Sequence, residues 1–309
     1  MADHSGAFSE AQVIARLREI FASPDPRIEV GIGDDAAVVT GEKRQVMTTD
    51  MVVEGVHFRT DWSTAFEIGR KVTAANAADI LAMGGVPDYL LVAVALTGSE
   101  SMDWISDLAR GVKFEAELAG LQIIGGDISK SENVIISMTA IGHCAKPILR
   151  SGAKPGDGIY LSSLTGWSAA GLALLKSKVP ATSAVMQKAL SEFKSPTIDY
   201  GFDSSKATAM CDISDSIIEQ ASQVATASQV QLHFDEKLIA RSEEFSSLQS
   251  LAAELKIDVW LWIFGGGEDH VLFATGADLP GVRIGEVLSG SGLSGIPAIE
   301  SDRVWSHFR

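Results

Sequence analysis

Apolar residues at near-helical spacing predict three helices in the N-terminal half of the chain. Residues 9–21 follow a capping serine, Ser9, and stop before two prolines. Residues 64–83 form an Ala-rich helix that ends at a Gly-Gly pair. Residues 102–118 form the third helix and stop near Gly120. Strand-like segments fill the spaces between these helices.

Short apolar and β-branched runs predict the strands of this half. The segments are 28–30, 36–39, 45–49, 89–96, 121–124 and 134–141. The 89–96 segment is continuously apolar, so we expect a buried strand there. Acidic residues follow two of the strands, because Asp50 ends one and Gly125-Gly126-Asp127 continues another.

A change of composition near Lys146 predicts a domain boundary. Residues 143–158 hold two prolines, three glycines and several charged residues, which is typical of a linker. We therefore expect an N-terminal domain of residues 1–146 and a C-terminal domain of residues 147–309. In the second half we expect strands at 159–162 and 259–264, and helices at 168–175, 213–227 and 245–255. The 177–209 stretch has no clear pattern. Strands and helices mix in both halves, so the fold class is α/β or α+β.

Composition narrows the functional classes. The 309 residues carry a net charge of −15 with no basic run, which argues against a nucleic-acid partner. No apolar run approaches a membrane span, and the first residues do not resemble a signal peptide. Cys144 and Cys211 are the only cysteines and lie far apart in the sequence. We therefore expect a cytoplasmic protein without a membrane or nucleic-acid partner.

The Gly-Asp-Asp segment that begins at Gly31 is not a dinucleotide fingerprint. Residues 31–36 satisfy its letters, but strand-like residues follow where a helix is required. The two adjacent carboxylates, Asp34 and Asp35, would also repel a bare pyrophosphate. If this segment is extended, their side chains point in opposite directions.

Aspartates recur at the ends of apolar segments, which favours a magnesium site over a zinc site. Mg²⁺ prefers hard oxygen ligands and is usually held by a few carboxylates together with substrate phosphates. Asp beside Gly is more often a turn or cap residue, and Asp212 or Asp215 could simply cap a following helix. Asp79 lies within an apolar helix, where an unpaired carboxylate is costly.

Eight strings of residues together resemble the thiamine-monophosphate kinase family, which shares a superfamily with aminoimidazole ribonucleotide synthetase. In chain order the strings are GIGDDAAVV, MTTDMVVEGVHF, RKVTAANAADILAMGG, LQIIGGDIS, RSGAKPGDGIYLS, CDISDSI, GGGEDHVLF and the ending WSHF. The resemblance covers nearly the whole chain apart from 177–209. It implies a two-domain aminoimidazole ribonucleotide synthetase-like fold whose N-terminal sheet is shared across a homodimer, with ATP bound between the halves.

The resemblance also implies a reaction and a set of site residues. The reaction is ATP-dependent phosphorylation of thiamine monophosphate to thiamine diphosphate, assisted by several Mg²⁺ ions. The implied metal ligands are Asp35, Thr48, Thr49, Asp50, Asp79, Asp127, Asp212 and Asp215, of which Asp50, Asp127 and Asp215 are the expected catalytic residues. The implied ATP contacts are Gly126, Asp127, Arg150 and Ser214, and the implied thiamine monophosphate contacts are His57, Glu268 and Trp305.

The chain departs from the family pattern at three positions in its second half. Ser216 stands where the family usually has glycine, Gln220 where it has a later aspartate, and Trp167 where it has the aspartate of Gly-Asp-Ser. Two alternatives therefore stay open. One is another ATP-dependent enzyme of the superfamily, and the other is a thiamine-phosphate-binding protein that has lost turnover.

Overall fold

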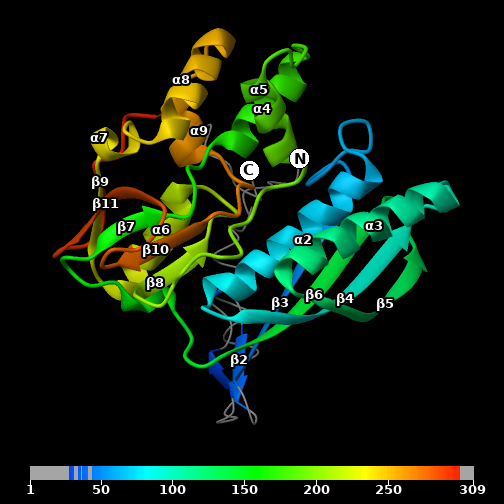
Figure 1. The fold of residues 1–309 in the computed structure, drawn as a ribbon, viewed down its shortest axis with the longest axis horizontal. Coiled ribbons are helices and arrows are strands. Elements are labelled where there is room, and N and C mark those ends of the chain that lie inside the picture. The colour runs from blue at the N-terminus through cyan, green and yellow to red at the C-terminus, as the bar shows by residue number, and fades with distance from the viewer. Residues whose placement is uncertain (1–27, 31–33, 36, 41–43, 300–309) are drawn as a thin grey trace, which may run out of the picture.

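The computed structural model describes residues 28–30, 34–35, 37–40 and 44–299, and Figure 1 shows two halves, each built on a mixed sheet. The expected helix at 9–21 lies outside the described residues. The first sheet has the strand order β1-β2-β3-β6-β4-β5. Its strands are β1 (Ile28–Val30), β2 (Ala37–Thr40), β3 (Arg44–Val53), β4 (Val86–Leu96), β5 (Gln122–Lys130) and β6 (Ile135–Cys144).

Two helices, α2 (Ala65–Ala82) and α3 (Met102–Ala119), cover one face of this sheet. Helix α2 begins with a capping box, in which Thr64 accepts from the backbone N–H of Glu67 and Glu67 reaches back to Thr64. The two helices approach closely at Gly111, where a Cβ would lie 2.0 Å from the carbonyl oxygen of Phe66. Both helices agree with the sequence prediction to within two residues at either end.

The other face of the first sheet is open among the described residues. Residues of β6 alternate between buried and partly exposed, as expected when helices cover only one side. Strand β4 was predicted to be buried, and this was wrong, because Tyr89 is 47% exposed and Leu91 is 37% exposed. Strand β5 is exposed along its whole length. The open face thus displays apolar side chains to the surface.

The second half contains a sheet in the order β12-β9-β11-β7-β10-β8, together with most of the helices. Its strands are β7 (Gly158–Leu161), β8 (Ala207–Asp212), β9 (Gln231–Phe234), β10 (Leu272–Gly276), β11 (Val282–Leu288) and β12 (Gly292–Ser294). Its helices are α4 (Trp167–Ser177), α5 (Ala184–Lys194), α6 (Ile217–Ser228), α7 (Glu236–Ile239), α8 (Glu243–Leu255) and α9 (Val259–Gly265), and a 3₁₀ turn, η1 (Arg150–Gly152), precedes β7. The strands and helices around this sheet enclose its hydrophobic core.

Two predictions for the second half were inaccurate. Residues 259–264 form helix α9 instead of a strand, because Asp258 caps the backbone N–H of Trp260 and starts a helical turn. Helix α6 begins at Ile217, four residues later than predicted. The unassigned 177–209 stretch contains helix α5, which packs against α4.

Helix α2 lies at the junction of the two halves. It packs on β3, β6 and β4 of its own sheet and also contacts β8, β10 and α5 of the second half. Side chains of α2 therefore contact both halves of the molecule. Within the described part of the chain, no helix has the length and apolar character needed to cross a membrane.

Candidate active site

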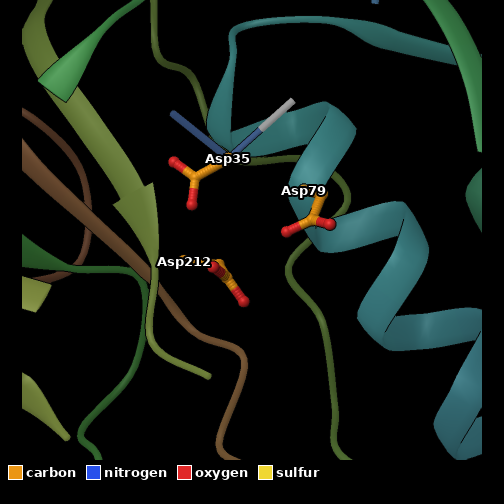
Figure 2. Close-up of side chains that lie close together, drawn as sticks. All are labelled: Asp35, Asp79 and Asp212. Carbon is orange, nitrogen blue, oxygen red and sulfur yellow. The ribbon is translucent and has the colours of Figure 1, made fainter. Parts of the chain in front are cut away.

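Three carboxylates from separate segments meet at the junction of the halves. Asp79 projects from α2, Asp212 ends β8, and Asp35 lies in the bend before β2. Figure 2 shows their carboxylates turned toward one another, and one oxygen of each lies within 4.8 Å of the others. We call these residues the acidic triad. Sequence analysis had singled out all three as metal ligands, and the fold brings them together.

Asp212 is buried, Asp35 and Asp79 are partly buried, and the charges of the triad repel one another. Burial raises the pKa of Asp35, which the Arg150 guanidinium lowers in part and nearby Asp212 raises further. Burial also raises the pKa of Asp79, and the negative charges of Asp50, Asp212 and Asp35 act in the same direction. The Oδ2 atom of Asp35 is buried without a hydrogen-bond partner. A group of buried oxygen ligands with an unsatisfied acceptor fits a divalent cation such as Mg²⁺.

Two residues of β3, Thr48 and Asp50, lie beside the triad on the sheet face that α2 covers. The Thr48 hydroxyl donates to Asp79 Oδ2 at 2.5 Å and lies 3.4 Å from the Asp35 carbonyl oxygen. Asp50, two residues along the same strand, acts electrostatically on Asp79. The strand was predicted to end at Asp50, but it continues to Val53, so Asp50 lies within the sheet. The alternation of the strand explains why Thr48 and Asp50 share one face.

Arg150 neutralises part of this negative charge. Its guanidinium contacts the carboxylates of both Asp34 and Asp35, and Gln220 Oε1 accepts from it at 3.3 Å. The two aspartates therefore point to the same side, contrary to the expectation for an extended segment. The backbone bends here, and Asp34 Oδ1 accepts from the Asp35 N–H.

The segment between β8 and α6 is held in place by side chains. Ser216 is the N-cap of α6 and accepts from the Glu219 N–H, so neither Asp212 nor Asp215 caps this helix. Gln220 also lies 3.4 Å from the Ser214 hydroxyl and thereby connects Ser214 to Arg150. Two departures from the family pattern, Ser216 and Gln220, thus have definite structural roles beside the triad.

A second polar group lies beside the triad. The His270 imidazole is 3.1 Å from Asp212 Oδ2, and Lys71 of α2 forms an ion pair with Glu268 at 2.9 Å. Burial would raise the pKa of Glu268, but Lys71, His270 and His57 outweigh it and hold the pKa at about 2. His57 and Glu268, which were predicted as substrate contacts, are thus close enough to interact.

Lys71, Asp269 and His270 were not singled out from the sequence. Lys71 offered a signal, since a lysine in the middle of an apolar helix needs a partner when buried.

Asp269 accepts from the backbone N–H groups of Gly166 and Ser168 and so supports the start of α4. Burial raises the pKa of Asp269 to about 6, although both of these hydrogen bonds lower it. Hydrogen-bonding of this kind is invisible in the sequence because the partners lie about a hundred residues apart.

Trp167, the third departure, is a packing residue in this chain. Its ring is buried, its Nε1 donates to Glu244 at 3.0 Å, and the Lys188 ammonium lies 4.1 Å from the ring centroid. The indole therefore links α4, α5 and α8. Its side chain does not contribute a carboxylate to the site.

Three predicted site residues in the described part of the chain, Thr49, Gly126 and Asp127, are not brought to the triad. The register places the Thr49 side chain on the open face of the first sheet, where its hydroxyl donates to the Met138 carbonyl oxygen. Gly126 and Asp127 lie in β5, three strand spacings or roughly 14 Å from β3. A Cβ at Gly126 would lie 1.8 Å from the Val92 carbonyl oxygen, so strand packing alone requires this glycine. Trp305 lies outside the described residues.

Known proteins resemble this chain over most of its length. Residues 33–144 match the family described as AIR synthase related protein, N-terminal domain. Thiamine-monophosphate kinase of Corynebacterium glutamicum is 37% identical over 254 residues, which cover 79% of this chain and 76% of that protein. The Mycobacterium tuberculosis protein of the same name is 37% identical over 271 residues, 84% of this chain and 80% of that one. The chain belongs to the thiamine-monophosphate kinase family.

Solved structures in this family have the same fold. AaThiL complexed with AMPPCP and TMP matches with a TM-score of 0.85 and 27% identity, covering 94% of this chain and 95% of that one. Thiamine-monophosphate kinase from Stenotrophomonas maltophilia matches with a TM-score of 0.75 and 27% identity, covering 97% and 99%. The HypE–HypF complex, at a TM-score of 0.68 and 16% identity over 92% and 95% of the two chains, shares the fold alone. The predicted aminoimidazole ribonucleotide synthetase-like α/β fold is confirmed.

Proposed function

We propose that this protein transfers the terminal phosphoryl group of ATP to the phosphate of thiamine monophosphate, giving ADP and thiamine diphosphate. The observation that carries the proposal is the acidic triad, assembled from both halves in a chain of this family. The family member AaThiL was solved with AMPPCP, an ATP analogue, and TMP bound, which supports the same pair of substrates here.

The charge of the acceptor determines what the site residues must do in the reaction. A phosphate oxygen is already anionic at neutral pH, so the reaction needs positioning and charge neutralisation rather than a strong general base. In the proposal, Arg150 and Ser214 contact ATP, and Gln220 orients both through its hydrogen bonds. His57 and Glu268 meet the acceptor, and the family resemblance adds Trp305.

The residues around the triad fit Mg²⁺. Asp35, Thr48, Asp50, Asp79 and Asp212 would hold the ions, with Asp215 nearby in the β8–α6 segment. When bound, Mg²⁺ neutralises the negative charge that develops on the transferring phosphoryl group. The apolar helix α2 keeps Asp79 in a fixed position, and the capped helix α6 does the same for Asp215.

We propose that the protein acts as a homodimer. Strands β4 and β5 expose six large apolar or aromatic side chains, and β5 is the edge strand of this sheet in the described part of the chain. We call five of them, Tyr89, Leu91, Ile123, Ile124 and Ile128, the β4–β5 patch. Asp127 lies within this exposed strand, so the proposed roles of Asp127, Gly126 and Thr49 depend on a second copy covering the sheet.

We propose two domains and a cytoplasmic location for this protein. Division into residues 1–146 and 147–309 agrees with the change from the first sheet to the second. Two buried free cysteines and the use of ATP fit a reducing, cytoplasmic location. Neither nucleic acid nor a membrane is required as a partner.

The decisive experiment is an ADP-release assay with ATP, Mg²⁺ and thiamine monophosphate. Matched formation of ADP and thiamine diphosphate, abolished by EDTA and absent with unphosphorylated thiamine, would establish the kinase reaction. Binding of thiamine monophosphate without turnover would instead favour the non-catalytic alternative. Absence of both binding and turnover would favour a different acceptor.

Asp79→Asn tests whether the triad carries this activity. We expect kcat to fall at least about a hundredfold, because a ligand for the charge-neutralising ions is lost. The variant should also lose the rise in melting temperature that Mg²⁺ gives the wild type. The matched control is Asp107→Asn on the exposed surface of α3, which should retain both properties. A fully active Asp79→Asn variant would exclude the triad as the metal site.

A further inference from the structure

Lys71 is a buried cation at the junction of three segments. It extends from α2, only 4% of its surface is exposed, and its ammonium forms an ion pair with Glu268 Oε2 at 2.9 Å. The same ammonium donates to the Phe193 carbonyl oxygen at 3.1 Å and lies 4.8 Å from the centroid of the Phe193 ring. Both partners belong to the second half of the molecule.

Glu268 is held in an uncommon conformation. Its φ angle is +67°, in the left-handed region that non-glycine residues seldom adopt. Its backbone N–H donates to the Ser214 carbonyl oxygen at 2.7 Å, and 20% of its side chain remains exposed. Strained residues of this kind persist when their surroundings determine them, and they cluster at ligand sites.

The ion pair determines how this carboxylate is presented. Lys71 engages Oε2 at 2.9 Å and so restrains the position of the carboxylate, while 20% of the Glu268 side chain stays exposed and can meet an acceptor. Burying a carboxylate without a partner would favour its neutral form, and the adjacent ammonium prevents this. A charged and oriented carboxylate is suited to an aminopyrimidine or to a thiazolium cation.

The position of Lys71 along α2 separates it from the metal end of the site. Lys71 and Asp79 lie eight residues apart on one helix, which corresponds to about 12 Å along its axis. This span matches the distance between the organic end and the phosphate end of a small phosphorylated acceptor. A change at Lys71 should therefore affect the acceptor more than the metal ions or ATP.

We propose that Lys71 is a positioning residue that orients Glu268 for the organic end of the acceptor and thereby sets the affinity for thiamine monophosphate. This inference rests on the proposed function. Lys71 acts through Glu268 and does not touch the reacting phosphates. Phe193 contributes by packing its ring against the ammonium and so confines it to one position.

The test compares Lys71→Met with Lys194→Met. Lys194 also joins α5 to α2, through Glu67 at 3.4 Å, but its partner lies one turn from Lys71 on the far side from Asp79. We expect Lys71→Met to raise the KM for thiamine monophosphate about tenfold or more, with little change in the KM for ATP. Lys194→Met should change neither constant. Equal effects of the two variants on both constants would overturn the proposal.

A double-mutant cycle with Glu268→Gln identifies the route of the effect. If Lys71 acts through Glu268, Lys71→Met should add little to the rise in KM already caused by Glu268→Gln. Independent, multiplicative effects would contradict the proposal. Calorimetric binding of thiamine monophosphate without ATP gives the same comparison separately from turnover.

Lys71→Arg covers the case in which methionine prevents folding. Arginine keeps the positive charge but is longer and planar, so it displaces the Glu268 carboxylate. We expect a severalfold rise in the KM for thiamine monophosphate at nearly unchanged kcat, and an unchanged KM would count against positioning. Wild-type protein that releases no ADP with thiamine monophosphate would refute the proposed function itself, whereas an active wild type with unaffected Lys71 variants refutes this inference alone.

Discussion

At the scale of single residues, the site combines two opposite ways of burying charge. The acidic triad brings like charges together, so its carboxylates are held at a cost that a cation can relieve. The Lys71–Glu268 pair brings unlike charges together and needs no further partner for stability. The first arrangement suits binding of a metal, and the second suits a group that must stay charged and oriented.

Glu268 should make stability depend on pH in the acid range. Its pKa is about 2 in the folded protein and near 4.5 when unfolded, so its contribution is complete above about pH 4.5 and is lost as pH falls toward 2. Glu268→Gln should therefore lower the free energy of unfolding by up to about 3 kcal/mol at pH 7. Urea unfolding at pH 7, 4.5 and 3.5 should show this deficit shrinking only below about pH 4.5. A deficit that is constant down to pH 3.5 would contradict the low pKa.

At the scale of elements, local signals decided which parts could be predicted. Helix α2 was predicted closely because its capping box and its terminal glycine pair are both visible in the sequence. Helix α9 was mistaken for a strand because seven residues of mostly large apolar side chains carry no clear period. Strand β5 continues through Gly125-Gly126 because the glycines allow close contact with β4. This contact cannot be predicted from the local sequence.

Local sequence patterns also predicted the site only in part. The aspartates could be listed from the family strings, but the separation of Thr49 and Asp127 from the triad depends on strand register and pairing. The contacts of His270, Asp269 and Lys71 depend on long-range packing between the two halves. Residue types indicated the chemistry, whereas tertiary structure determined the partners.

Ser216, the N-cap of α6, can be tested by mutation. Ser216→Ala should lower the free energy of unfolding by about 1 kcal/mol, because the Glu219 N–H loses its acceptor. The variant should also lower kcat, because Ser214 and Asp215 lie directly before the cap. Ser242→Ala removes the equivalent cap of α8, away from the site, and should cost similar stability at unchanged kcat. Equal kcat in both variants would mean that the α6 cap is purely structural.

At the scale of the whole molecule, the described residues cover the first sheet with helices on one side only. In the described part of the chain, helices α2 and α3 occupy one face, and Tyr89 and Leu91 lie exposed on the other. Ile128 lies exposed on the edge strand β5, beside its β4 partner Val94. An exposed sheet edge with large apolar residues is prone to associate with another chain. A second copy that covers the patch would protect the edge and complete the surroundings of Asp127.

Ile128→Asp tests this association. Ile128 is 73% exposed on β5, so a charge there should leave the fold intact but oppose burial of the patch in a dimer. We expect light scattering after size-exclusion chromatography to show a dimer for the wild type and a monomer for Ile128→Asp. Val179→Asp, which alters an exposed apolar residue of the second half, should remain dimeric. A monomeric wild type would refute the dimer outright.

The ion pair between Lys71 and Glu268 has a consequence for folding while the chain is being synthesised. Lys71 leaves the ribosome about 200 residues before its partner, although N-terminal segments usually fold first. During that interval α2 carries a cation on a surface that is later buried and has no counter-charge to meet. We therefore expect the packing around Lys71 to be completed only after the GGGEDH segment has emerged. A nascent chain arrested before that segment would hold α2 in an unfinished state that chaperones and proteases can recognise.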